Sequence, residues 1–261
     1  MQIQPLLDSL SIVSVIGVFT LGALLAYEGG FRIGCWWQNR VPEEREGPAN
    51  MIVGSLLALL SFLLAVTMGM ASDRFEARRG VILAEANSLG TTFLRAGYLP
   101  EDASNQIRGL LREYVPLRIV SYDDPEADVS ARIVRSVGLQ TKLWSIAEQL
   151  ARTAPESHAV ALFIESLNQS IDLHEARIAG SLYGRVPETV LHLLLLSSIL
   201  TLGMVGYNAG LRFRRGTPSA LMLIVVLGAV LSLLLDLDRF QEGFLRVNQQ
   251  PLIDLAERLG T

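Results

Sequence analysis

The sequence has little of the chemistry on which soluble enzymes depend. Cys35 is the only cysteine, which excludes a disulfide framework and any metal centre built from several cysteines of one chain. Lys142 is the only lysine among 22 basic residues, and only three histidines occur. Charged residues make up 18% of the chain, against about 25% in ordinary soluble domains. The composition therefore argues against a soluble domain, and a net charge of −4 gives no reason to expect nucleic acid as a partner.

Motifs for catalysis and cofactor binding are also lacking. The chain has no phosphate-binding Walker loop, no dinucleotide-binding glycine pattern and no zinc-protease helix motif. Asp236-Leu237-Asp238 opens like a calcium-binding loop, but Phe240 stands at the third ligand position. We therefore expect a protein that is not an enzyme and has no cofactor and no metal site.

Four long runs without Asp, Glu, Lys or Arg are present instead. They cover residues 9–27, 47–72, 189–211 and 216–235. A helix rises about 1.5 Å per residue, so about 20 apolar residues cross the hydrocarbon core of a bilayer. The runs predict four transmembrane helices. No basic residue precedes the first run, so we expect it to be a retained span rather than a signal peptide.

The runs divide the chain into two hairpins on either side of a polar middle. The predicted fold is an all-α integral membrane protein, with a first transmembrane hairpin at 1–72 and a second at 189–235. Between them, residues 73–188 should form an extramembrane helical bundle, and the tail at 236–261 should pack on that bundle. The connectors inside the hairpins are expected at 28–46 and 208–219.

Helical periodicity continues through the middle region, without strand alternation. Span two should run on past the membrane, because no proline occurs until Pro100. Pro116 should kink or end the following helix, and another should end near Thr153. The clearest helix has a seam of residues three and four positions apart, typical of coiled coils: Val160, Ile164, Leu167, Ile171, His174, Ile178 and Leu182.

Span two carries a stripe of small residues. Small residues let helix backbones approach closely in lipid, which favours close helix packing. The stripe also fits a helix that lines a pore, where Phe62 and Val66 would form a hydrophobic constriction. Both roles can hold on different faces. The small residues are Gly54, Ala58, Ser61, Ala65, Gly69 and Ser72.

Span four ends in Asp236, Asp238 and Arg239. Charges at a membrane boundary are costly unless they are paired or hydrated. We expect a structural network that ties the tail to the bundle; an ion-binding ring is the alternative.

Several short motifs together resemble a known family. Ser61-Phe62-Leu63-Leu64, followed by Asp73-Arg74-Phe75-Glu76-Ala77-Arg78, resembles the second-span signature of bacterial bestrophins. The sequence is more similar still to the bestrophin-like domain family of bacterial membrane proteins, over about residues 54–252. The motifs of that family are similar to Gly54-Ser55-Leu56-Leu57-Ala58-Leu59-Leu60, Arg78-Arg79, Glu85-Ala86-Asn87, Leu94-Arg95-Ala96, Arg112-Glu113-Tyr114, Asp236-Leu237-Asp238-Arg239 and Gln249-Gln250-Pro251-Leu252.

The resemblance implies a fold and a function. Bestrophins are pentameric anion channels whose neck is lined by apolar rings from span two. Carried onto this chain, the rings fall at Ala58, Phe62 and Val66, which share one helix face. Bestrophins usually have a larger apolar residue where Ala58 stands. The family motifs also imply a polar network of Arg74, Arg78, Glu85, Asn87, Asp236, Asp238, Arg239, Gln249 and Gln250.

The two sides of the membrane give opposing signals. The short connectors carry six arginines, and the positive-inside rule would place them in the cytoplasm. The other side also has arginines near the span ends, and bestrophins keep that side in the cytoplasm. We expect a multi-pass protein of the bacterial inner membrane with its middle region in the cytoplasm.

Two functions are compatible with these features. The favoured one is a homo-oligomeric ion channel, a pentamer by resemblance, that conducts anions through an axial pore lined by span two. The alternative is a non-conducting membrane scaffold or sensor whose helical bundle binds a partner. A channel requires Phe62 to face the pore axis, and a monomer or dimer would favour the scaffold.

Overall fold

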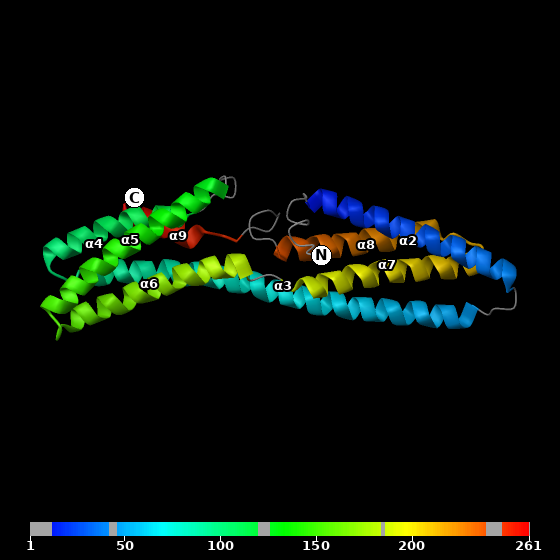
Figure 1. Ribbon diagram of the computed structural model, residues 1–261, viewed down its shortest axis with the longest axis horizontal. Helices are drawn as coiled ribbons and strands as arrows, with labels where there is room; N and C mark the ends of the chain where they lie inside the picture. The colour runs from blue at the N-terminus through cyan, green and yellow to red at the C-terminus, as the bar shows by residue number, and fades with distance from the viewer. Residues whose placement is uncertain (1–11, 42–45, 120–125, 184–185, 239–246, 261) are drawn as a thin grey trace. The chain divides into compact units, whose positions relative to one another are not determined.

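The computed structural model describes residues 12–41, 46–119, 126–183, 186–238 and 247–260, and most of these residues are helical. No strand occurs in these ranges, so the predicted all-α class is confirmed. Eight helices follow one another along this part of the chain (Figure 1): α2 Ile12–Arg40, α3 Glu46–Ala96, α4 Glu101–Leu117, α5 Glu126–Thr153, α6 His158–Tyr183, α7 Glu188–Leu211, α8 Thr217–Asp238 and α9 Gln250–Leu259.

Four of the helices are long and apolar enough to cross a membrane, as many as the sequence predicts. They are Val13–Arg40 in α2, Pro48–Ala96 in α3, Glu188–Leu211 in α7 and Thr217–Asp238 in α8. Two residues in the short turn between α7 and α8 have a positive φ, Phe213 at 52° and Gly216 at 46°. The turn lies inside the connector expected at 208–219.

The first span is longer than expected. Helix α2 continues for 29 residues to Arg40, so the prediction of a connector beginning at residue 28 is wrong. No proline interrupts the helix before Pro42, and its later turns still bury apolar side chains such as Phe31. The connector was predicted from the four glutamates and three arginines at 28–46. The helix nevertheless continues past the charge-free run to Arg40.

The chain forms two compact units, and α3 contributes to both. The first lies within Met1–Arg74 and Arg185–Leu245, and the second within Phe75–Gly184 and Arg246–Thr261. In the first unit α2 packs along α7 and, less extensively, along α8 (Figure 1). Its core contains side chains from all four span-forming helices, among them Phe19, Leu60, Leu194, Leu202, Ile224 and Leu231.

Glycines bring α2 and α7 into backbone contact. Gly30 and Gly34 lie four residues apart on α2, as do Gly206 and Gly210 on α7. A methyl group added at Gly30 would collide with the Gly203 carbonyl oxygen, and one at Gly206 with that of Tyr27. Close approach of this kind is how helices pack in lipid when small residues recur every fourth position. The closest helix packing in this unit therefore lies between spans one and three, and not along the small stripe of span two.

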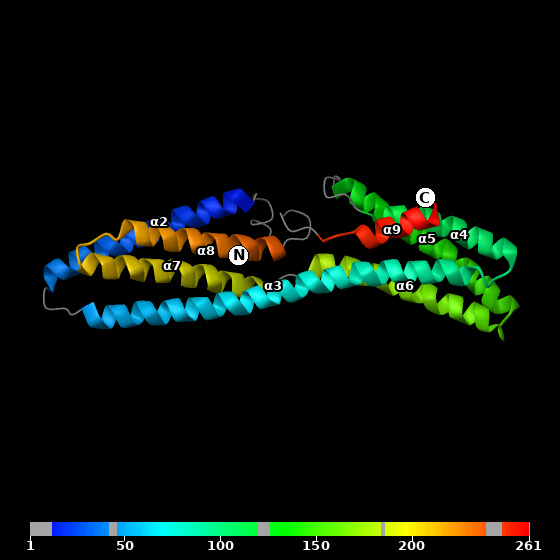
Figure 2. The same cartoon turned by 180° about the vertical axis from the view of Figure 1, so that it is seen from behind.

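The second unit has its own core of α4, α5, α6, α9 and the latter part of α3 (Figure 2). Helix α4 begins after Pro100, has Glu101 and Asp102 in its first turn, and ends one residue after Pro116. Helix α5 ends at Thr153. These boundaries confirm the predicted ones. Helix α9 packs on α4, where the Arg112 guanidinium donates a hydrogen bond to the Leu259 carbonyl at 2.7 Å.

The predicted seam on α6 faces this core. Val160, Leu167 and His174 are buried, and Ile164, Ile171 and Ile178 are partly buried. The last member, Leu182, lies outside the residues whose side chains are described. The seam prediction is confirmed for the six described positions, because a spacing of three and four keeps them on one side of the helix.

Candidate functional site

The candidate pore residues share an exposed face of α3. Phe62 and Val66 are 64% and 46% exposed in the single chain, and Ala58 is exposed as well. They are four residues apart, so their side chains follow one another along one side of the helix. All six residues of the small stripe, from Gly54 to Ser72, are also exposed.

The opposite face of the same helix is packed. Leu60 is buried in the core of the first unit, and Leu63 and Leu64 pack against that core. Only 11% of the most apolar part of α3 is buried, compared with 22% in α2, 33% in α7 and 39% in α8. Helix α3 is therefore the span whose apolar surface is covered least by the rest of its own chain.

Hydroxyl groups on α3 are turned back on the helix. Ser55 donates to the Met51 carbonyl at 2.9 Å, Ser61 to the Leu57 carbonyl at 2.8 Å and Thr67 to the Leu63 carbonyl at 2.7 Å. A hydroxyl has a single hydrogen to donate. Since these hydrogens are used within the helix, the exposed serines can only accept hydrogen bonds from their surroundings.

Glu85 is the centre of a buried ion pair network in the second unit. Its side chain is fully buried, and its two carboxylate oxygens accept hydrogen bonds from Arg118 at 2.6 Å and Arg177 at 2.9 Å. The arginine side chains are 5% and 10% exposed. Arg118 lies just beyond the end of α4, so the stop after Pro116 helps to place it. The network joins α3, α4 and α6.

Arg177 extends this network to the segment before α9. Its guanidinium donates to the Gln249 side-chain oxygen at 3.3 Å. Gln249 immediately precedes α9, which starts at Gln250 with Pro251 in its first turn. Glu85 and Gln249, both expected in the polar network, are thus joined through an arginine that the sequence motifs did not include.

A second buried chain of hydrogen bonds lies beside the first. The Tyr114 hydroxyl is 3.0 Å from His174 Nδ1 and accepts a hydrogen bond from Gln140 at 3.0 Å. Burial raises the pKa of Tyr114 to about 12. Burial, followed by the positive charge of Arg118, lowers the pKa of His174 to about 4. His174 is therefore a neutral core residue at physiological pH. This agrees with its predicted position on the apolar seam of α6.

Small hydroxyl side chains close the gap between α3 and α6. Ser88 Oγ lies 2.8 Å from Ser170 Oγ, and Thr92 Oγ1 lies 3.1 Å from the same atom. All three residues are buried. The sequence prediction missed this cluster, whose only signal is that small polar residues recur at helical spacing on the inner faces of both helices.

The two aspartates at the end of α8 are buried in the first unit. Asp238 accepts a hydrogen bond from the Val186 backbone N–H at 2.7 Å, just before α7 begins at Glu188. A carboxylate is favourable there, because the first N–H groups of a helix lack partners within it. Asp236 is 3% exposed. Asp238 therefore links the end of span four to the start of span three.

The other predicted network residues are dispersed. Arg78 is 8% exposed and Arg74 is partly buried, whereas Asn87 is exposed. Gln250 is exposed and donates to Asp254 at 2.7 Å within α9. Arg239 lies outside the described residues. The members therefore occupy several environments, and a shared role for them stays a prediction.

A model of the bestrophin-like domain matches residues 25–252, which covers most of the chain, from the second half of α2 to the start of α9. The chain belongs to the bestrophin-like family. The resemblance inferred from the short motifs is thereby confirmed, and the chain is a membrane protein of that family.

Solved structures agree with this bestrophin-like fold. Two crystal structures of a bestrophin homologue from Klebsiella pneumoniae, each with one mutation, match 95% of this chain and 96% of their own. Their TM-scores are 0.60 and 0.57, at 14% and 15% identity. A crystal structure described as a membrane protein has a TM-score of 0.61 at 14% identity, over 95% of this chain and 97% of its own. No curated protein sequence matches the chain.

Proposed function

We propose that this bestrophin-like protein is a subunit of an oligomeric ion channel, with a pore lined by the exposed face of α3. The observation that carries the proposal is the exposure of Ala58, Phe62 and Val66 on the span that is least buried in its own chain. An apolar face left uncovered in one subunit can contact lipid, another copy or a pore. The small residues beside Phe62 favour the latter two, since they permit close approach of helices.

The mechanism is passive permeation controlled by wetting. In a closed ring of subunits, Phe62 and Val66 would form successive apolar constrictions that expel water, and a dry constriction blocks ions. The hydroxyls of Ser55 and Ser61 donate to their own helix, so they have no hydrogen left to donate to water on this face. We propose a pentamer that conducts anions, and the resemblance to bestrophins supports this proposal.

The same proposal includes the arrangement in the membrane. Residues 1–72 and 189–235 form two transmembrane hairpins, residues 73–188 form an extramembrane bundle in the cytoplasm, and the tail at 236–261 packs on it. The membrane is the bacterial inner membrane. Within the bundle, Glu85 and Gln249, together with Arg118 and Arg177, tie the segment before α9 to α3 and α6.

Anion flux through liposomes that contain the purified oligomer tests the proposal. We expect chloride efflux that depends on the protein, and a particle of five subunits by mass measurement in detergent. A correctly folded monomer or dimer without flux would contradict the channel. The scaffold or sensor hypothesis would then replace it, supported by the exposed Leu83 and Leu94 on the bundle part of α3 and Tyr98 just after it.

A further inference from the structure

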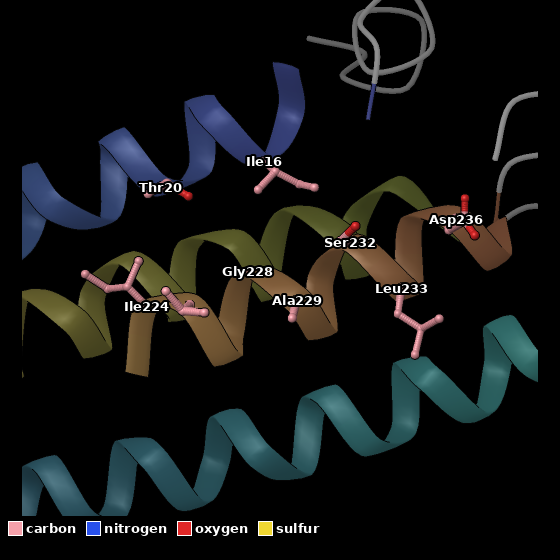
Figure 3. Close-up of a pocket in the computed structure, with 9 residues that line it drawn as sticks. Ile16, Thr20, Ile224, Gly228, Ala229, Ser232, Leu233 and Asp236 are labelled. Carbon is pink, nitrogen blue, oxygen red and sulfur yellow. The ribbon is translucent and has the colours of Figure 1, made fainter. Parts of the chain in front are cut away.

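A groove of about 600 Å³ lies between α2 and α8 (Figure 3). Both walls belong to candidate membrane spans, so the surrounding medium at this depth is lipid rather than water. Cavities of roughly 300–1,000 Å³ are the size that binds small molecules. The groove is lined by Ile16, Thr20, Ile224, Val225, Gly228, Ala229, Ser232, Leu233 and Asp236.

The α8 wall of the groove has a lining residue at every fourth position, from Ile224 through Gly228 and Ser232 to Asp236. At a helical rise of about 1.5 Å per residue this wall is about 18 Å long. Half of a bilayer core of about 30 Å is about 15 Å. The groove therefore matches the depth of one leaflet, which is the length available to one acyl chain.

Gly228 gives the groove its depth. A methyl group at this position would come no closer than 3.9 Å to the Phe19 ring, so the backbone conformation and neighbouring packing leave room for a side chain. Glycine in the middle of a helix is otherwise unfavourable by about 0.5–1 kcal/mol relative to alanine. A methyl group therefore fits here, and a larger side chain would extend from a residue that lines the groove.

The polarity of the groove is uneven. Asp236 lies at one end of the α8 wall and Ile224 at the other, with Ser232 one turn from Asp236 (Figure 3). The Asp236 side chain is buried and also interacts elsewhere in the chain. A carboxylate has about four acceptor sites, so it can hold more than one donor. In low-dielectric surroundings a carboxylate attracts a headgroup that carries an amine, and it repels a phosphate headgroup without an amine.

We propose that the groove binds one acyl chain of a phospholipid whose headgroup carries an amine. The acyl chain lies along α8 from Ser232 to Ile224, and the amine reaches Asp236. This lipid site is separate from the pore proposed on α3, so lipid binding there can be tested independently of ion conduction.

Lipid retention measured by native mass spectrometry tests the acyl-chain part. The protein is reconstituted in vesicles of equal phosphatidylethanolamine and phosphatidylglycerol, extracted in mild detergent and weighed with its retained lipids. We expect one retained lipid per chain in the wild type, and loss of that lipid in Gly228→Leu and Ala229→Leu. The control Val226→Leu lies on an exposed part of α8 outside the groove and should retain it.

The headgroup part is tested by Asp236→Asn in the same vesicles. The wild type should retain phosphatidylethanolamine in excess over phosphatidylglycerol, and Asp236→Asn should lose that preference. Should Asp236→Asn misfold, Ser232→Ala, one turn away, should weaken the preference in the folded protein. Equal lipid retention in the wild type, Gly228→Leu and Ala229→Leu would overturn the proposal, because the retained lipid would then be bound outside the groove. A wild type that retains phosphatidylglycerol equally well would overturn the headgroup assignment.

Discussion

At the scale of single residues, Glu85 should be the most sensitive charge in the second unit. Glu85→Gln leaves two nearly buried arginines facing a neutral amide. Removing one partner of a buried ion pair costs about 3–5 kcal/mol of unfolding free energy. We expect a clear fall in the thermal midpoint of the purified protein in detergent.

Glu76→Gln is the matched control for this experiment. Glu76 is also on α3, but it is 62% exposed and 3.7 Å from an equally exposed Arg79. Exposed pairs are worth at most about 1 kcal/mol. Equal midpoints for the two variants would show that the Glu85 network does not stabilise the bundle.

His174 should make stability depend on pH on the acid side. Its pKa is about 4 in the folded chain and 6.5 for the unperturbed side chain. Between these values the unfolded chain binds a proton that the folded chain does not, so stability falls as pH falls from 6.5 towards 4. The full effect of His174 is about 3 kcal/mol.

The measurement is the thermal midpoint at about pH 7.5 and pH 5 for the wild type and His174→Gln. Glutamine does not titrate, so the difference between the two pH values should shrink in the variant. An unchanged difference would assign the acid sensitivity to other groups.

Some residues of the buried networks could be predicted from the sequence, but the arginines that pair with Glu85 could not. Glu85 and Gln249 were recognised from family motifs, and His174 from its position on an apolar seam. Arg118 and Arg177 were not, because an arginine becomes a partner of Glu85 only when α4 and α6 pack on α3. Local spacing carries no information about that packing, and a chain with 22 basic residues offers many candidates.

At the scale of helices, the glycine contact between α2 and α7 predicts opposite changes in stability for alanine substitutions at two neighbouring glycines. Gly30→Ala places a methyl group against the Gly203 carbonyl, and should destabilise the protein by about 1–3 kcal/mol. The adjacent Gly29 has nothing within 4 Å of an added methyl group. Gly29→Ala should therefore stabilise by about 0.5–1 kcal/mol, because alanine is the better helix former.

Thermal midpoints of the two variants in detergent check this contrast. Opposite shifts at neighbouring positions would tie the effect to the interface rather than to helix propensity. A Gly30→Ala variant as stable as the wild type, or more stable, would indicate that α2 does not pack on α7 through this face.

Helices were predictable where apolar periodicity and proline agree, as at both ends of α4. The end of the first span was not, because the rule that charges end a span fails for Glu28 and Arg32. These residues lie four apart and form an ion pair at 2.9 Å on the surface of α2. The glycines at positions 30 and 34 then continue the contact with α7. The close packing predicted for the small stripe on α3 is not found within the chain, because all six residues of the stripe are exposed.

At the scale of the whole molecule, the four spans fix which segments share a side of the membrane. One crossing, α8, separates the turn before Thr217 from the C-terminal segment. A reporter fused after Thr261 and one inserted between residues 212 and 217 should therefore report opposite sides. Reporters on the same side would contradict the four-span arrangement. A C-terminal reporter in the periplasm would reverse the proposed orientation and leave the number of spans intact.

Ion flux through Phe62 variants tests the pore most directly. We expect purified pentamers with Phe62→Ala to release chloride from liposomes faster than the wild type, because a smaller ring wets more easily. Phe62→Trp should slow the release. Leu63, which packs against the core instead, serves as the control: Leu63→Ala should lower stability by about 2–5 kcal/mol without the same rise in flux. Assembled protein that shows no flux in any Phe62 variant, or equal leakage in Phe62→Ala and Leu63→Ala, would contradict a pore lined by this face of α3.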